Sequence, residues 1–152
     1  MCITEVVLEV LEQQRALALE QKIEWKTELE PAVCRGEREF LLKVAGNLAN
    51  NAIHYNKPNG WIRVSTFTQD DRIILKVSNA GPGIPADQQP LVFERFYRAE
   101  KSRANGGHHS GLGLAIVEAI VKAHGGDVTL ESELNVQTTF TVRLPAWGSR
   151  PD

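Results

Sequence analysis

The sequence predicts an α+β fold, a two-layer α/β sandwich with three helices on one face of a mixed, mostly antiparallel sheet. Apolar residues recur at helical spacing in three segments, and each segment precedes two runs that alternate or are rich in β-branched residues. The linkers within these pairs of runs are short, which favours hairpins and an antiparallel sheet. At 152 residues and 42% apolar content, the chain suits one domain, residues 1–152, with a sizeable core.

The first third of the chain predicts a helix and a strand pair. Thr4 is the expected N-cap of a helix whose apolar positions run through residues 6–18. Residues 23–29 alternate between apolar and polar side chains, as in a strand with one wet face. Pro31 turns the chain, and a short strand is expected around Val33.

The remaining elements follow the same periodicities. We expect helices at 37–53 and 112–124 and strands at 61–68, 72–78, 127–134 and 138–144. Residues 79–110 are rich in Gly and Pro and show no clean period, with a helical turn near Phe93. Because so long a loop is unusual in a compact domain, residues 85–110 are interpreted as a lid over a binding site.

Charge and composition exclude several classes of protein. Seventeen basic and nineteen acidic residues give a net charge of −2, which disfavours binding nucleic acid through bulk charge. No apolar run reaches the ~18 residues that a membrane span needs, and the N-terminus lacks the basic start of a signal peptide. We therefore expect no direct membrane contact.

Cys2 and Cys34 have no metal-binding spacing and are expected to be thiols in a reducing compartment.

Two glycine clusters flank the predicted lid. Residues 79–84 (NAGPGI) follow a strand, and residues 110–116 (SGLGLAI) open a helix. Glycine allows a backbone to approach a ligand closely, and a helix N-terminus attracts anions. The second cluster is not a dinucleotide fingerprint, because Ile116 occupies the third small position, and no Gly-Lys pair marks a P-loop. Taken alone, either cluster could be ordinary loop glycines.

Asparagines crowd one stretch of the second predicted helix and its end. Asn47, Asn50, Asn51, Asn56 and Asn59 fall within thirteen residues, although asparagine is a poor residue for a helix interior. Asn47 and Asn51 are four residues apart and so share one helix face. Their amide oxygens could ligate a hard cation such as Mg²⁺ between phosphates. The alternative is a set of solvated polar residues at a helix end.

These motifs together resemble those of sensor histidine kinases. Residues 47–55 (NLANNAIHY) resemble the N box, 79–84 the G1 box, 93–98 (FERFYR) the F box and 110–116 the G2 box. The match runs from about residue 5 to residue 145 in the family's order. It implies a Bergerat-type ATP-binding catalytic domain, and residues 77–79 (VSN) resemble the heavy-metal-sensor branch.

The resemblance implies a set of roles at an ATP site. Asn51 would ligate Mg²⁺, with Asn47 supporting the ion and phosphates. Asn79 would recognise the adenine amino group. Tyr55 would lie against adenine or be a core-edge aromatic, and His54 would meet a phosphate or be a surface histidine. The other implied contacts are Gly81, Gly83 and Ile84 near the purine, Ser110, Gly111, Leu112 and Gly113 around the phosphates, and Arg98, with Arg95, Lys101 and Arg103, on the lid.

Two features depart from the family pattern. Most relatives carry Asp at position 79, and Asn79 lacks the charge that assists the hydrogen bond from the adenine amine. The pair His108 and His109 resembles an insertion and is interpreted as lid surface. His124, at the end of the third helix, is interpreted as a C-terminal cap.

No histidine of the chain stands in the phosphoacceptor context of the family. The resemblance therefore implies a catalytic fragment that phosphorylates a histidine on a dimeric helical domain of the same kinase, upstream of a response regulator. It implies a cytoplasmic domain whose parent protein lies in the bacterial inner membrane. Three alternatives stay open: a gyrase-like or Hsp90-like ATPase, an anti-sigma-type serine kinase, or a docking module without activity. The first two carry Glu where Asn47 stands, and Asn47 cannot accept a proton.

Overall fold

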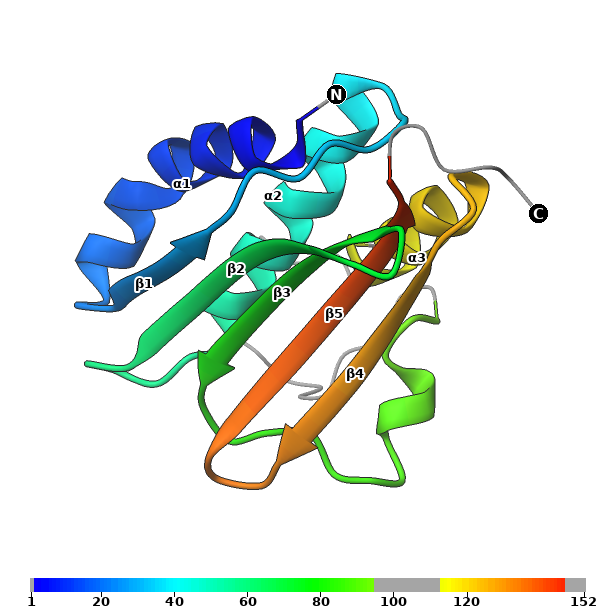
Figure 1. Ribbon diagram of the computed structural model, residues 1–152. Helices are drawn as coiled ribbons and strands as arrows, with labels where there is room; N and C mark the ends of the chain where they lie inside the picture. The colour runs from blue at the N-terminus through cyan, green and yellow to red at the C-terminus, as the bar shows by residue number, and fades with distance from the viewer. Residues whose placement is uncertain (1, 95–112, 147–152) are drawn as a thin grey trace.

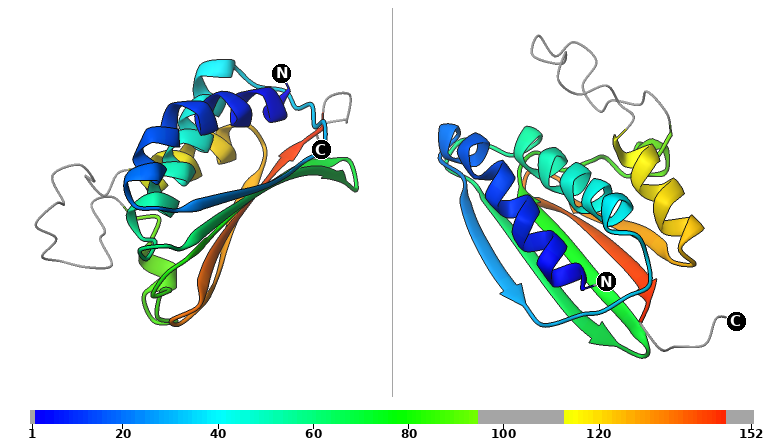
Figure 2. Two further views of the ribbon diagram at one scale, coloured as in Figure 1. Left: turned by 90° about the vertical axis from the view of Figure 1, so that its left-hand side faces the viewer. Right: turned by 90° about the horizontal axis from the view of Figure 1, so that it is seen from above.

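Five strands form one sheet in the order β1-β2-β3-β5-β4, and the three helices lie on one of its faces (Figures 1 and 2). The computed structural model describes residues 2–94 and 113–146. The elements are α1 (Ile3–Glu20), β1 (Glu24–Leu29), α2 (Arg38–His54), β2 (Trp61–Gln69), β3 (Arg72–Ala80), the 3₁₀ turn η1 (Gln89–Leu91), α3 (Gly113–Ala123), β4 (Asp127–Glu133) and β5 (Gln137–Pro145). The predicted two-layer α+β sandwich is confirmed.

One strand pair differs from the hairpins predicted. The pairs β2–β3, β3–β5 and β4–β5 are antiparallel, whereas β1 pairs with β2 in parallel, from Glu24 opposite Trp61 to Leu29 opposite Thr66. The prediction of a short strand around Val33 is wrong. Val33 and Cys34 form only isolated bridges, to Cys2 and Ala146 respectively. Pro31 ends the ladder because it has no N–H to donate, and α2 then serves as the crossover that a parallel pair requires.

Thr4 does not cap α1 as predicted, because the helix begins one residue earlier, after Cys2. The Thr4 hydroxyl lies inside the first turn and donates to the carbonyl oxygen of Glu30 at 2.8 Å. It also accepts the N–H of Ala32 at 3.2 Å and lies 3.2 Å from Oγ1 of Thr66. Thr4 therefore ties the start of α1 to the end of β1 and to β2.

The helical turn predicted near Phe93 is found as η1, which ends two residues earlier. The cap predicted at the end of α3 agrees with the structure: Nδ1 of His124 lies 2.8 Å from the carbonyl oxygen of Ile120. Since a carbonyl only accepts, this ring nitrogen carries the proton.

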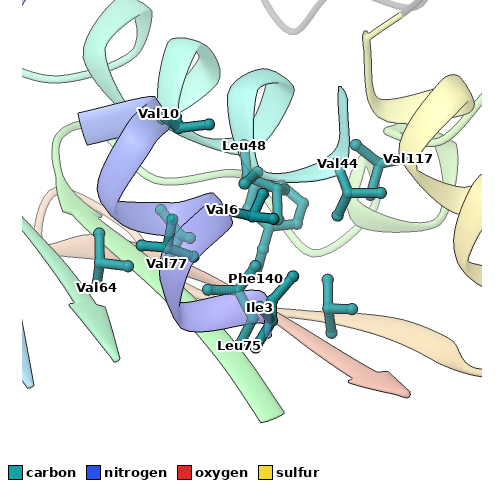
Figure 3. Close-up of a cluster of buried hydrophobic side chains, with 14 of the residues drawn as sticks. Ile3, Val6, Val10, Val44, Leu48, Val64, Leu75, Val77, Val117 and Phe140 are labelled. Carbon is teal, nitrogen blue, oxygen red and sulfur yellow. The ribbon is translucent and has the colours of Figure 1, made fainter. Parts of the chain in front are cut away.

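The core fills the space between the helices and the sheet (Figure 3). Strand residues that face the helices are buried, and residues on the opposite face are mostly polar or partly exposed. Among the described residues, Phe140 on β5 is the largest fully buried side chain. Around it, Figure 3 shows side chains from all three helices and from the sheet: Ile3, Val6, Val10, Val44, Leu48, Val64, Leu75, Val77 and Val117.

Cys2 and Cys34 form no disulfide. Cys34 is fully buried, and this burial raises the pKa of its thiol.

The β2–β3 turn strains two aspartates. Asp70 and Asp71 have φ angles of 51° and 63°, the left-handed conformation of a two-residue hairpin turn that favours Gly.

We expect Asp71→Gly to raise the free energy of unfolding by about 0.5 kcal/mol, because relief of the Cβ clash exceeds the added chain entropy of Gly. Urea unfolding measures the change. Asp71→Ala, which removes the charge but keeps Cβ, should give no gain, and an equal gain would assign the effect to charge.

Candidate functional site

The C-terminal half of α2 meets the end of β3 and the start of α3. At Gly81, after β3, a Cβ would lie 2.3 Å from the carbonyl oxygen of Tyr55, which caps α2. At Gly113, the first residue of α3, a Cβ would lie 3.5 Å from Oδ1 of Asn47. Figure 2 shows α2 and α3 side by side over the sheet. Three motifs far apart in the sequence therefore converge at one end of α2.

Asn51 carries a buried oxygen without a partner. Its side chain is 5% exposed, and Oδ1 has no hydrogen-bond donor among the described residues. Leaving a buried polar atom unpaired costs about 1–3 kcal/mol, so the fold keeps Asn51 at the expense of stability. Ala would suit the helix better, and the Asn51 oxygen is left able to accept a hydrogen bond or ligate a cation.

The donor set fits a hard cation held jointly with phosphates. Amide oxygens are ligands that Mg²⁺ accepts, and Mg²⁺ keeps waters and phosphate oxygens as its other ligands. The unpaired Oδ1 of Asn51 and Oδ1 of Asn47, one turn earlier, supply such oxygens. Within the described ranges, no three His, Cys, Asp or Glu side chains gather into a metal site of their own.

Asn79 has one amide atom fixed by its neighbour. The residue is 3% exposed, and Nδ2 donates to the carbonyl oxygen of Ala80 at 2.9 Å. Because that carbonyl can only accept, the amide nitrogen must face it, which leaves Oδ1 as an acceptor. This is the polarity that an amino group on a bound base requires.

The glycines of the NAGPGI segment pack against protein backbone. Besides the contact of Gly81 with Tyr55, a Cβ at Gly83 would lie 2.5 Å from the carbonyl oxygen of Glu133, and φ of Gly83 is 77°. Both glycines are thus needed for close packing of α2 and the β4–β5 turn on this loop. Sequence reasoning missed these contacts, since no pattern tells which backbone approaches a glycine.

Ile84 is held through its backbone on both sides. Its N–H donates to Oγ of Ser132 on β4 at 2.8 Å, and its carbonyl accepts from Nε2 of Gln89 at 2.9 Å. Ser132 also lies 3.0 Å from Oγ1 of Thr138 on β5. Ser132 was not predicted as a site residue, because a lone serine in a strand carries no signal in the sequence.

His54 and Tyr55 end α2 with their rings in contact. The ring centroids are 4.6 Å apart in an edge-to-face arrangement, and both residues are partly buried. The N–H of Tyr55 donates to the carbonyl oxygen of Asn51, which links the aromatic pair to the unpaired amide one turn away.

Four of the five clustered asparagines fall into two groups. Asn56 is a turn residue: Nδ2 donates to the carbonyl oxygens of Ala52 and Trp61, and Oδ1 accepts the N–H of Lys57. Asn59 adopts φ 62°, a conformation that asparagine tolerates. Asn47 and Asn51 form the second group, at the convergence of α2 with α3.

The other predicted site residues lie outside the part of the chain that the structure describes. These residues are Arg95, Arg98, Lys101, Arg103, His108, His109, Ser110, Gly111 and Leu112.

The fold and the convergent asparagine and glycine motifs define a Bergerat-type domain, and comparison with known proteins identifies its family. The family model described as histidine kinase-, DNA gyrase B- and HSP90-like ATPase matches residues 36–148, and the chain belongs to this family.

The similar curated proteins are sensor histidine kinases. The probable sensor histidine kinase TcrY of Mycobacterium tuberculosis is 42% identical over 84% of this chain and 27% of its own length. Sensor histidine kinase RppB of Synechocystis is 33% identical over 97% of this chain and 33% of its own. The chain thus spans about a third or less of these relatives.

Solved structures agree in fold. The mycobacterial sensor histidine kinase MprB superimposes with a TM-score of 0.84 at 30% identity, covering 100% of this chain and 99% of that one. Full-length ShkA in complex with AMPPNP gives 0.83 at 26% identity, covering 96% of this chain and 30% of that one.

We expect Ser132→Ala to loosen the segment at Ile84. The Ile84 N–H loses its acceptor, worth about 1 kcal/mol, so its hydrogen exchange should accelerate about fivefold. Amide exchange followed by NMR measures this rate. Ser78→Ala is the matched control, because Ser78 bonds Thr139 at 2.8 Å across the neighbouring ladder and should leave Ile84 unchanged. Equal acceleration by both variants would contradict the specific role of Ser132.

Proposed function

We propose that this domain binds Mg·ATP and donates the γ-phosphoryl group to a histidine on a separate, dimeric helical domain of the same kinase. The observation that carries the proposal is the unpaired buried Oδ1 of Asn51, in a family whose similar curated members are sensor histidine kinases. The structure of the similar kinase ShkA holds the ATP analogue AMPPNP. A response regulator would then take the phosphoryl group in two-component signalling.

Each described site residue has a role in this proposal. The Asn51 oxygen ligates Mg²⁺, and Asn47 supports the ion and the phosphates. Mg²⁺ supplies charge neutralisation on the phosphates when it is bound. Oδ1 of Asn79 accepts a hydrogen bond from the adenine amino group, and Tyr55 lies against the ring. His54 contacts a phosphate oxygen.

The proposal extends to the purine and phosphate contacts and to the predicted lid. Gly81, Gly83 and Ile84 border the purine. Ser110, Gly111, Leu112 and Gly113 surround the phosphates at the start of α3, where the helix N-terminus favours anions. Arg98 brings positive charge to the transferring group.

The chain itself supplies positioning rather than a nucleophile. Phosphoryl transfer depends on alignment and charge stabilisation, and the acceptor histidine comes from the partner domain. Asn47 has no proton-accepting group, so it cannot activate water as the Glu of the ATPases does. The asparagine at position 47 therefore favours a histidine kinase over an ATPase or a serine kinase. A docking module without a ligand would not explain the unpaired buried oxygen of Asn51.

We also propose that the domain works in the cytoplasm, attached to a parent protein in the bacterial inner membrane. Over the described residues, every helix is too short or too polar to span a bilayer.

We expect Asn51→Ala to abolish the Mg²⁺ dependence of ATP binding, with a loss of affinity of about tenfold or more, about 1.4 kcal/mol. The fold should be as stable as before or more stable, because an unpaired buried amide is replaced by a better helix former. Calorimetric titration with and without Mg²⁺, together with thermal unfolding, measures both effects. Asn50→Ala is the matched control one residue away. Unchanged affinity and Mg²⁺ dependence in Asn51→Ala would show that the metal binds elsewhere.

We expect the chain to bind Mg·ATP without phosphorylating itself. Incubation with radiolabelled ATP and the dimeric helical domain of the same parent should place acid-labile phosphohistidine on that partner, with Arg98→Ala lowering the rate. Label on the fragment alone, or rapid phosphate release without the partner, would favour the serine kinase or the ATPase.

A further inference from the structure

We propose that two copies of this chain associate by pairing their β1 strands in antiparallel orientation around a twofold axis at Thr27. One sheet then continues through both copies. This contact goes beyond the proposed function, because β1 contributes no residue to the candidate site and the pairing needs no nucleotide.

The first step is the open edge of the sheet. β1 stands first in the strand order, and among the described strands β2 is its one neighbour (Figure 1). The N–H groups of Glu24 and Glu30 donate toward β2, at 3.1 and 3.0 Å from their acceptors. Since backbone groups alternate in direction along a strand, those of Trp25, Thr27 and Leu29 point to the open edge. Such a row of groups is a template for pairing with a further strand.

The second step concerns two charged side chains of β1. Lys26 and Glu28 are exposed and lie on the sheet face opposite the helices, since the alternate residues Trp25 and Leu29 pack against the core. Lys26 is in register with Arg63 on β2, and like charges opposite each other are destabilising. The ion pairs among the described residues include neither Lys26 nor Glu28. A carboxylate arriving at the open edge would compensate Lys26.

The third step is that β1 fits a second β1 in one register. Hydrogen-bonded pairs must join residues whose backbone groups point outward, so Thr27 can face Thr27 of the second copy. Trp25 then faces Leu29 of the other copy, and Lys26 faces Glu28. The twofold axis repeats both pairs. Threonine pairs, opposite charges and aromatic contacts each stabilise a ladder when they lie directly across from one another.

The charges of β1 also exclude the neighbouring register. Edge strands commonly carry charges that keep other strands away, but Glu24, Lys26 and Glu28 alternate in sign along one face. A register centred on Lys26 would oppose Lys26 to itself and Glu24 to Glu28, so every charged pair would repel. The register centred on Thr27 leaves only Glu24 facing Glu30, at the exposed ends of the ladder, where solvent screens the repulsion.

The helix-facing side of the strand adds apolar contacts. Trp25 and Leu29 are partly buried and pack against the core of their own copy. Figure 2 shows β1 at the outer border of the sheet, beside α1. Pairing Trp25 of one copy with Leu29 of the other joins the two cores at the axis and removes apolar surface from water.

The experiment is sedimentation equilibrium of the wild-type chain from about 10 μM to about 1 mM, the range in which a small interface associates. The wild type should form dimers as its concentration rises. Lys26→Glu and Glu28→Lys each make both charged pairs repulsive and should weaken dimerisation about tenfold or more. The double variant Lys26→Glu/Glu28→Lys should restore it. Lys76→Glu, on the same sheet face but on β3, is the matched control and should dimerise like the wild type.

Two further samples test the register and the edge. A mixture of Lys26→Glu and Glu28→Lys should form mixed dimers, because glutamate then faces lysine at both charged positions. Thr27→Pro should stay monomeric and folded by circular dichroism, since proline removes an outward N–H and is tolerated on an edge strand.

Separate outcomes overturn the pairing and the proposed function. A wild type that sediments as a monomer throughout the range overturns the pairing, and this result needs no variant to fold. Failure of the double variant or of the mixture to restore dimers overturns the register centred on Thr27. Mg·ATP affinity should be the same in all variants, because β1 lies outside the candidate site. Absence of Mg·ATP binding in the wild type would contradict the proposed function and leave the pairing standing.

Discussion

The approach of Gly81 to the Tyr55 carbonyl is the constraint on which the site depends. A Cβ there would stand 2.3 Å from that oxygen, so a larger residue would push the end of α2 off the end of β3. Asn47 and Asn51 on α2 and Asn79 on β3 would then no longer be held in their present positions relative to one another. Gly83 extends the same constraint to the β4–β5 turn, where its Cβ would stand 2.5 Å from the Glu133 carbonyl. In both places the close neighbour is a backbone carbonyl rather than a side chain.

Most of the fold follows from periodicity, because helical and alternating patterns report which face is buried. All three helices and the strands that became β1 to β5 were predicted in this way. The predictions for Val33 and Thr4 failed for the same reason. The local pattern suits a strand at Val33 and a helix cap at Thr4, but contacts with distant parts of the chain determine the structure of both residues. The parallel pairing of β1 with β2 joins segments that are more than thirty residues apart in the sequence, and no local sequence pattern predicts it.

The candidate site shows a similar division. Asn47 and Asn51 were predicted because their four-residue spacing places them on one helix face, and the unpaired oxygen of Asn51 gives that spacing a physical reason. Asn56 looks the same in the sequence but closes a turn through three hydrogen bonds. Ser132 and the Ala80 carbonyl had no signal at all, since their importance comes only from what the chain folds against them.

The bridges of Val33 to Cys2 and of Cys34 to Ala146 place both ends of the described chain at one corner. That corner adjoins the start of α2, whose 17 residues put the C-terminal end of the helix about 25 Å away. The two ends of the described chain and the C-terminal end of α2 therefore lie far apart, and a segment joined at that corner need not cover Asn47 and Asn51.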